Sequence, residues 1–468
     1  MKSYEELLEQ HSELDRGNFC VKAVKEFMGS QEYADALVAN RYYTKHNVTI
    51  ENFEKWVYTV TGRKVRDIYS ANYKLKASAF RRMVIQQANY LLGKGIQLDS
   101  NDKKKKLGKK FDLQLIKAAK WAMVEGRSFG FWNGDHMDVF GYCMTDTHPG
   151  FCPLYSDEDG ELKAGISFRM KVVGNKHVDT YTLFEPEGTT KYIKKGTDDI
   201  APDGARKPYK TRTVSTKAEG VIDVVGENYN GILPIVPLYA SDTYESELVG
   251  MRENIDCYDL VKSGLANNVD DASEIYWIVQ NAGGMDDVDL AQFLQRLKRT
   301  KAADVDSQSG GSAEAHTLDV PTDARKTLLE ILRTDMYDDM MLLDRRTMSA
   351  AQKTNQELEM AYQPQDDKTN DFEFFVMDFC EGIMALAGIE SEIRFERNKV
   401  VNNNELTQMV LSSATYLSPE CVIRHLPFLS PEEKEEEIRL LAERDIEQFS
   451  GSDGDDDEDE KEEQNEEE

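Results

Sequence analysis

Residues 228–237 read Asn-Tyr-Asn-Gly-Ile-Leu-Pro-Ile-Val-Pro, and this stretch separates two kinds of sequence. Pro234 and Pro237 bracket a short extended segment. We therefore expect this segment to close a sheet. Before it, over residues 129–225, short alternating apolar runs predict a β-rich layer, whereas apolar residues after it recur at helical spacing.

The β-rich layer consists of short strands separated by turn residues. Typical apolar runs are Gly165–Met170 and Thr180–Phe184, and Asn-Gly or Asp-Gly pairs separate such runs. Residues 161–173 and 177–184 both alternate between these turn signals. We predict that they form neighbouring antiparallel strands.

The first 125 residues are predicted to be mostly helical. The strongest helix spans Tyr73–Leu92, where apolar side chains recur on one face, and Gly93 follows its end. A second helix is predicted over Phe111–Glu125, with Gly126 after its last residue. Between the two helices lies a dense lysine run at 103–110, which is either a solvated loop or a contact surface for another protein.

Two amphipathic helices flank a smaller module in the second half of the chain. The first is predicted over Glu245–Asn267, and its apolar stripe is formed by Leu248, Met251, Ile255, Tyr258 and Leu265. The second is predicted over 322–345, with a stripe of Leu328, Leu332, Met336, Met340 and Leu343. Residues 275–320 between them are short-stranded. This order indicates a helical hairpin with a cap, and a last long helix over 371–387 follows it.

Charge and composition limit the classes of function. The 468 residues carry a net charge of −29, and residues 451–468 alone hold twelve acids and one lysine. This tail cannot bury a core, so we expect it to be disordered, as a solubilising segment or as a docking element. Tight binding to nucleic acid is not expected, because affinity for phosphate comes largely from lysine and arginine.

The sequence carries no apolar leader and no run of about 20 apolar residues, so we expect neither secretion nor membrane insertion. Six cysteines are scattered without a Cys-x-x-Cys pair, which favours reduced thiols over disulfides or a zinc ribbon.

No pattern indicates an enzyme or a cofactor. The phosphate-binding loop, the His-Glu-x-x-His pair and the Gly-x-Ser-x-Gly elbow are absent from the sequence. The seven histidines lack metal-ligand spacing. Asp135, Asp138 and Asp146 could bind a divalent ion, but acids in hairpin turns are usually solvated. A metal-dependent hydrolase stays open as an alternative on these three residues.

Several strings resemble those of a known family in both their order and their spacing. In chain order they are Arg41–Tyr43, Asn72–Lys76, Asn89–Lys94, Asn230–Pro237, Ile255–Ser263, Ile393–Asn398, Asn404–Glu405, Leu417–Pro427 and Glu433–Glu443. Together they resemble the portal proteins of tailed bacteriophages, the head–tail connector family. The resemblance covers roughly residues 40 to 445.

This resemblance implies an α+β subunit with a helical and β-containing wing, a two-helix stem, a small α/β clip and a helical crown, assembling into a ring. Carried over to this chain, the boundaries are wing 1–240 (with the β-rich layer at 129–240), first stem helix 241–267, clip 268–320, second stem helix 321–345, tunnel loop 346–355, long wing helix 356–389, crown 390–450 and disordered acidic tail 451–468.

The resemblance also implies the function and the partners. Portal proteins form rings of about twelve subunits at one capsid vertex, through which double-stranded DNA is packaged and ejected. The implied partners are further copies of the chain, the DNA, the terminase large subunit, a head–tail connector or adaptor protein, and the major capsid and scaffolding proteins. No membrane and no cofactor are implied. The expected location is the portal vertex of the virion, with the host cytoplasm during assembly.

The site residues follow from the same resemblance. The tunnel-loop candidates for transient contact with DNA are Arg345, Arg346, Lys353 and Asn355. The two arginines could instead pair with Asp338, Asp339 or Asp344. In the clip, the candidates for partner docking are Arg296, Lys298, Arg299 and Lys301, which could equally be solvated.

Pro364 departs from the family pattern, because proline in a helix interior should break or kink the long helix. A different alternative for the whole chain is an acidic adaptor or chaperone that binds basic partners through residues 451–468.

Overall fold

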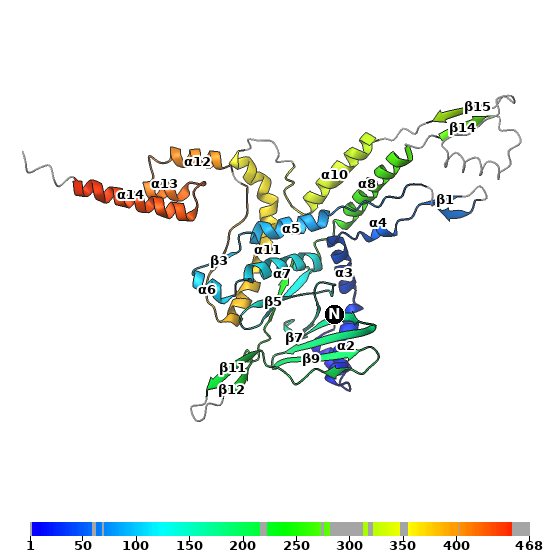
Figure 1. The fold of residues 1–468 in the computed structure, drawn as a ribbon, viewed down its shortest axis with the longest axis horizontal. Helices are drawn as coiled ribbons and strands as arrows, with labels where there is room; N and C mark the ends of the chain where they lie inside the picture. Colours follow the sequence, from blue (N-terminus) through cyan, green and yellow to red (C-terminus); the bar gives the residue numbers. More distant parts are fainter. Residues whose placement is uncertain are drawn as a thin grey trace, which may run out of the picture. The chain divides into compact units, whose positions relative to one another are not determined.

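The computed structural model describes residues 2–58, 62–67, 70–215, 222–272, 276–280, 312–316, 322–346, 354–400 and 402–451 (Figure 1). They form two compact units. The first comprises Met1–Leu342 with Gln365–Asn398, and the second comprises Leu343–Pro364 with Lys399–Glu468. Helices and strands are mixed, as the α+β prediction requires.

An eight-stranded sheet organises the first unit. Its strand order is β10-β9-β8-β7-β6-β5-β4-β13, and every neighbouring pair is antiparallel except β5 with β6. The strands are β4 (Arg127–Trp132), β5 (Met137–Gly141), β6 (Gly150–Tyr155), β7 (Leu162–Val173), β8 (Lys176–Glu185), β9 (Gly188–Lys195), β10 (Ala201–Pro202) and β13 (Ile235–Tyr239). The predicted antiparallel pairing of residues 161–173 with 177–184 is confirmed as β7 with β8.

Strand β13 closes the large sheet, as predicted, and lies at one of its edges. It pairs only with β4, in a register that places Pro237 opposite Phe129. An edge position is the place where a proline without an amide donor leaves the sheet intact. The stretch at 228–237 thus closes the sheet and leads the chain out of it.

Helix α7 (Phe111–Glu125) packs on strands β4, β5 and β13. Its bounds match the prediction, and Gly126 ends it with a φ of 82°. A Cβ atom at this glycine would lie 2.2 Å from the carbonyl oxygen of Tyr244, so the turn and the close approach both require glycine. Helices α3 (Gln31–Tyr43) and α5 (Ala79–Leu92) also pack against α7.

The other N-terminal helices are short and capped by side chains. Helices α1 (Tyr4–Gln10), α2 (Arg16–Met28) and α4 (Val48–Asn52) begin after Ser3, Asp15 and Asn47, each of which accepts a main-chain N–H of the first turn. Helix α2 packs on β6, β7 and β8. Helix α6 (Asn101–Lys106) occupies the lysine run.

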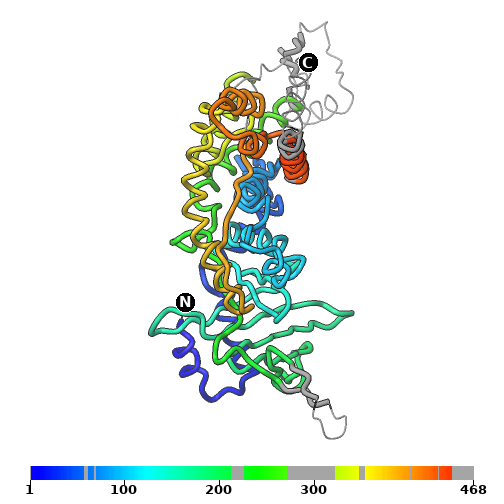
Figure 2. Tube along the Cα trace, turned by 90° about the vertical axis from the view of Figure 1, so that its left-hand side faces the viewer, coloured from blue at the N-terminus to red at the C-terminus, as the bar shows by residue number. Residues whose placement is uncertain are grey.

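Helix α11 (Asn355–Ala387) contains Pro364 without a break, so the predicted break is wrong. Proline has no main-chain N–H, so one main-chain hydrogen bond of the helix is missing at this position. Within the first unit, α11 buries Phe372, Val376, Phe379 and Ile383. The chain then returns along α11, as Figure 2 shows, and β16 (Ile393–Phe395) pairs with β3 (Ile96–Leu98).

Three further strand pairs stand apart from the large sheet. They are β1 (Trp56–Tyr58) with β2 (Lys64–Arg66), β11 (Lys210–Ser215) with β12 (Ile222–Glu227), and β14 (Tyr276–Gln280) with β15 (Ser312–His316). The second unit contains α12 (Asn403–Ser412), α13 (Pro419–His425) and α14 (Pro431–Gly451). Residues 452–468 of the predicted disordered tail lie outside the described residues.

Three predicted helices have different bounds. Residues 73–78 form neither helix nor strand, and the helix begins only at Ala79. Helix α8 begins at Arg252 instead of Glu245 and runs to Ala272. Helix α10 (Thr322–Asp339) ends before Arg345, because Met341 takes a φ of 51° and turns the chain away. No helix in the described part of the chain is long and apolar enough to cross a membrane.

Candidate functional site

Helix α8 is buried along one row of residues spaced four apart. The row begins with Met251, directly before the helix, and continues in the helix with Ile255, Asp259, Ser263 and Asn267, each no more than 5% exposed. Residues four apart lie above one another on a helix, so this row faces one side. The apolar start of the row was predicted. Its polar continuation replaces the expected stripe of Tyr258 and Leu265.

The polar residues of α8 bind the main chain of residues 71–78, which precede α5 and are here called the strap. Asp259 Oδ1 accepts the N–H of Ala77 at 2.8 Å, and Ser263 Oγ accepts the N–H of Leu75 at 3.0 Å. The third bond runs from the N–H of Tyr73 to Asn267 Oδ1 at 2.6 Å. Every second residue of the strap is therefore bonded to every fourth residue of the helix.

The two spacings match. Two residues of an extended chain advance about 6.6 Å, and four residues of an α-helix advance about 6.0 Å. Three successive bonds can therefore form without distortion. These bonds also explain why residues 73–78 are not helical, since their amide donors are taken by side chains about 190 positions later in the chain.

Helix α8 has a second polar attachment at the end of α3 and at α4. Asp256 accepts the hydroxyl groups of Tyr42 at 2.6 Å and Thr49 at 2.7 Å. The amide of Asn47 donates to Asp259 Oδ2 at 2.9 Å. Burial raises the pKa of Asp259, while the bonds from Ala77 and Asn47 oppose this shift by stabilising the carboxylate.

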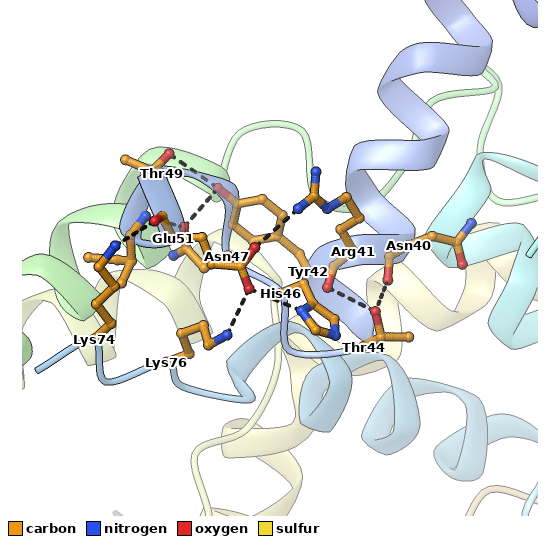
Figure 3. A network of polar contacts seen from close by, with 11 residues as sticks. Asn40, Arg41, Tyr42, Thr44, His46, Asn47, Thr49, Glu51, Lys74 and Lys76 are labelled. Carbon is orange, nitrogen blue, oxygen red and sulfur yellow. Dashed lines mark hydrogen bonds and ion pairs between the residues drawn. The ribbon is translucent and has the colours of Figure 1, made fainter. Parts of the chain in front are cut away.

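The other side of the strap is held by Glu51 of α4 (Figure 3). Lys76 Nζ lies 2.7 Å from Glu51 Oε1, and Arg41 Nη2 lies 3.1 Å from Oε2. Lys74 donates to the carbonyl oxygen of Glu51, and His46 Nδ1 lies 3.0 Å from Oε1. The hydrogen bond from Lys76, with that from His46, lowers the pKa of Glu51 to about 2. The strap thus bridges α4 and α8.

Helix α10 packs against α8. Leu332, Met336 and Met340 are buried, which confirms the central part of the predicted apolar stripe. At one end of the pair, Asn254 Nδ2 donates to Asp339 Oδ2 at 2.7 Å, and further along, Arg325 donates to the carbonyl oxygen of Gly264. The two helices therefore form the hairpin that the sequence indicates.

The predicted tunnel-loop residues belong to the second unit. Arg345 and Arg346 are exposed, and the N–H of Arg346 donates to Asp344 Oδ1 at 3.0 Å. Among the residues that the structure describes, Arg345 has no carboxylate within ion-pair distance, and Asp339 instead accepts from Asn254. Lys353 lies outside the described residues.

Asn355 is engaged at the first turn of α11. Its Oδ1 accepts the N–H of Asn402 at 2.8 Å, its Nδ2 donates to the carbonyl oxygen of Asn402, and its own N–H donates to Glu405. Thr354 and Glu357 form a reciprocal cap beside it. The side chain of Asn355 therefore fixes the start of the helix within the second unit.

The clip candidates Arg296, Lys298, Arg299 and Lys301 all lie outside the described residues. Of the predicted acids, Asp135 and Asp138 both lie beside His136, and Asp138 Oδ2 is 3.5 Å from its Nε2. Across the described ranges, no three His, Cys, Asp or Glu side chains gather as a metal site.

The hydrogen bonds around α8 fix this helix against residues 42–77 of the first unit. Residues 29–449 match the family described as phage portal protein, SPP1 Gp6-like. The portal protein of Clostridium phage phiCD119 is 23% identical over 442 residues, which cover 88% of this chain and 93% of that protein. The portal protein of Bacillus phage SPP1 is 22% identical over 452 residues, with coverages of 89% and 86%.

The chain belongs to the phage portal protein family, as the resemblance predicted. It is a portal for DNA packaging, and the family is structural instead of catalytic.

Sequence reasoning missed the polar row of α8 and the strap. The available signal was the spacing of four between Asp259, Ser263 and Asn267 inside an otherwise amphipathic helix. Sequence reasoning also took the lysine run at 103–110 as the one dense basic segment and missed a more widely spread one. Residues 41–82 hold ten lysines and arginines against three acids, spread too widely to form a run.

Proposed function

We propose that copies of this chain close into a ring of about twelve subunits around a channel for double-stranded DNA. The match to the portal family over residues 29–449 supports this proposal most strongly. The helix pair α8 and α10, tied to the core by the polar row, supplies the stem that such a channel needs.

The subunit is then divided as the family pattern divides it. The wing comprises residues 1–240 and 356–389, the stem 241–267 and 321–345, and the clip 268–320. The tunnel loop is 346–355, the crown is 390–450, and the acidic tail is 451–468. In this division the strap and α4 anchor the first stem helix to the wing, so that the stem keeps its position while DNA moves.

The channel binds DNA weakly, because few lysine and arginine side chains contact the phosphates. Each lysine or arginine that contacts phosphate adds affinity, and many such contacts would hold the DNA in place. Arg345, Arg346 and Lys353 make transient phosphate contacts in a chain of net charge −29. Asn355 holds the end of the loop through its bonds to Asn402.

The partners follow from the position of the ring at one capsid vertex. The terminase large subunit and later the connector or adaptor protein dock on the clip through Arg296, Lys298, Arg299 and Lys301. The major capsid and scaffolding proteins contact the wing, where the exposed lysines of α6 are available. Assembly takes place in the host cytoplasm, and the terminase supplies the energy for packaging. The portal itself needs no cofactor.

Complementation of a phage that lacks its portal gene tests the proposal. The wild-type chain should restore DNA-filled heads. The triple variant Arg345→Ala, Arg346→Ala, Lys353→Ala should still form rings and heads but should change the amount of packaged DNA. The matched control Lys171→Ala, Lys176→Ala removes two exposed lysines of the β7–β8 hairpin and should package normally. Normal packaging by the triple variant would contradict the assigned channel residues, and empty heads with the wild-type chain would contradict the proposed conduit.

A further inference from the structure

One side of α11 in the first unit combines acids with an exposed aromatic ring. Asp367, Asp371, Phe374 and Asp378 follow at intervals of four, three and four residues, so they share one face of the helix. All four are exposed, and Phe374 is 70% exposed. A large apolar side chain that stays exposed among charges on an ordered helix indicates an interaction surface. We call these four residues the acidic face.

A cleft of about 620 Å³ lies beside the acidic face. Lys368 neutralises Glu247 there, at 2.6 Å. The carboxylates of Asp242, Asp367 and Asp371, which also line the cleft, have no partner among the described residues. Unpaired carboxylates around an exposed ring favour a ligand that brings both positive charge and an aromatic or apolar group.

The buried amide of Gln87 gives a second, independent indication. This side chain lines the same cleft and is 1% exposed. Its Nε2 donates to Thr369 at 3.0 Å, whereas its Oε1 has no hydrogen-bond partner. A buried acceptor without a donor is uncommon in folded proteins and calls for an explanation. A ligand with N–H donors in the cleft would supply one.

The β1–β2 hairpin has the complementary chemistry. Trp56 is 49% exposed and lies opposite Arg66 in the strand register, so both side chains are on one face. Lys64 shares this face, with its Nζ 5.0 Å from the centre of the Trp56 ring. Both Lys64 and Arg66 are exposed, although Arg66 also contacts Glu54 at 3.3 Å. The hairpin sits in the segment 41–82, the basic part of an acidic chain.

The hairpin is not part of a larger sheet among the described residues. Strands β1 and β2 form a two-stranded sheet of their own, and no described strand extends it. An isolated two-stranded hairpin is marginally stable in water, so a docked partner would stabilise it. Tryptophan and arginine are the residues that most often dominate the binding energy of an interface.

We propose that the β1–β2 hairpin of one subunit docks on the acidic face of α11 in the next subunit. The inference rests on the proposed ring, because contacts within a ring join two different surfaces of neighbouring copies. The two surfaces share no residue, and Figure 1 draws α8 between the hairpin and α11. Trp56 would enter the cleft beside Phe374, and Lys64 and Arg66 would face Asp367 and Asp371.

Charge reversal tests this pairing on the full-length chain. One variant carries Lys64→Glu with Arg66→Glu, a second carries Asp367→Lys with Asp371→Lys, and a third carries all four changes. The matched control Lys171→Glu with Lys176→Glu reverses two exposed lysines in another hairpin, next to the exposed Val172 and Val173. Mass from light scattering over a concentration series measures ring assembly, and circular dichroism confirms that each variant is folded.

Each double variant should raise the concentration needed for assembly by about tenfold or more, and the fourfold variant should restore most of the wild-type value. The control should match the wild type. Unchanged assembly in either folded double variant, or no rescue in the fourfold variant, would overturn the pairing while the ring itself stands. DNA binding that is lost with Lys64→Glu and Arg66→Glu while assembly is unchanged would assign the hairpin to nucleic acid instead. A wild-type chain that forms no ring would overturn the proposed function.

Discussion

Helices α7 and α8 are both held against the same core, but by different forces. Helix α7 buries leucine, alanine and methionine side chains under the sheet, among them Leu115, Ala119 and Met123. Helix α8 buries Ile255, one turn after the buried Met251 that precedes the helix, and then the polar row Asp259, Ser263 and Asn267. Apolar packing is non-directional, whereas hydrogen bonds fix distance and direction.

The two kinds of contact constrain the two helices in different ways. Small side chains let α7 lie close to the sheet, and its contribution is burial of apolar area. Each side-chain acceptor of the polar row of α8 binds one main-chain N–H of the strap. A shift along the helix axis would therefore break three hydrogen bonds together. Helix α8 is therefore fixed in register, as its proposed role as a stem helix requires.

Truncation of the apolar core of α7 should have the largest effect on stability. Leu115 is fully buried, and a Leu→Ala change in a core leaves a cavity, so Leu115→Ala should lower the free energy of unfolding by about 3 kcal/mol. The control is Leu113→Ala on the same helix, where the side chain is 64% exposed, with an expected loss under about 0.5 kcal/mol. Urea unfolding followed by tryptophan fluorescence measures both, and equal losses would contradict the packing described for α7.

Removal of the central acid of the polar row should come next. Asp259→Ala leaves the N–H of Ala77 and the amide of Asn47 without an acceptor, and we expect a loss of about 2–3 kcal/mol in the free energy of unfolding. Asp259→Asn retains one acceptor and should lose about half as much. The exposed Glu253→Ala on α8 is the control and should be near neutral. A neutral Asp259→Ala would show that the polar row does not hold the strap.

The buried carboxyl at the end of α7 predicts a pH effect. Glu125 accepts from Asn40 and Cys143, and its Oε1 lies 3.7 Å from His148 Nε2. Burial raises the pKa of Glu125 to about 7 and lowers the pKa of His148 to about 4. Between about pH 4.5 and 6.5, Glu125 is protonated in the folded state and ionised in the unfolded state. In the same range His148 is neutral in the folded state and protonated in the unfolded state.

These two contributions have opposite signs and should nearly cancel in the wild type. His148→Gln removes the histidine contribution, so stability should fall as pH rises, by about 1.4 kcal/mol per pH unit and about 2 kcal/mol from pH 5 to 6.5. Glu125→Gln should give the opposite slope. Urea unfolding at several pH values measures the slopes, and identical slopes in the two variants would show that neither group titrates as its burial indicates.

The smallest effect should be local to the strap. Ser263→Ala removes one acceptor that the N–H of Leu75 can replace with water, because Leu75 is partly exposed. We expect a loss of about 1 kcal/mol, seen as about fivefold faster hydrogen exchange at Leu75, with no change at the amides of α7. Faster exchange throughout the first unit would mean that the bond supports the whole fold instead of the strap.

The regions that local patterns describe were predictable from the sequence. The bounds of α7, the pairing of β7 with β8 and the closing of the sheet by β13 follow from periodicity and from proline or glycine at the ends of the elements. The strap was not predictable in this way, because Leu75 and Ala79 fit the apolar face of a helix. What keeps the strap from being helical is a set of acceptors on α8, far away in the chain.

In the candidate site, too, some features were predictable from local sequence patterns and others were not. The helix hairpin of α8 and α10 was expected, since its apolar stripe is a local pattern. The engagement of Asn355 with Asn402 depends on two segments that meet only in the folded second unit, so no local pattern could predict it. Arg345 and Arg346 are exposed, in keeping with the phosphate contacts proposed for them.

The most direct test of the proposed conduit is the mass of the purified full-length chain by light scattering, with negative-stain imaging of the same fraction. We expect a particle of about twelve subunits with a central hole. A monomer or dimer that persists at high concentration, and also in the presence of capsid and scaffolding proteins, would contradict the ring.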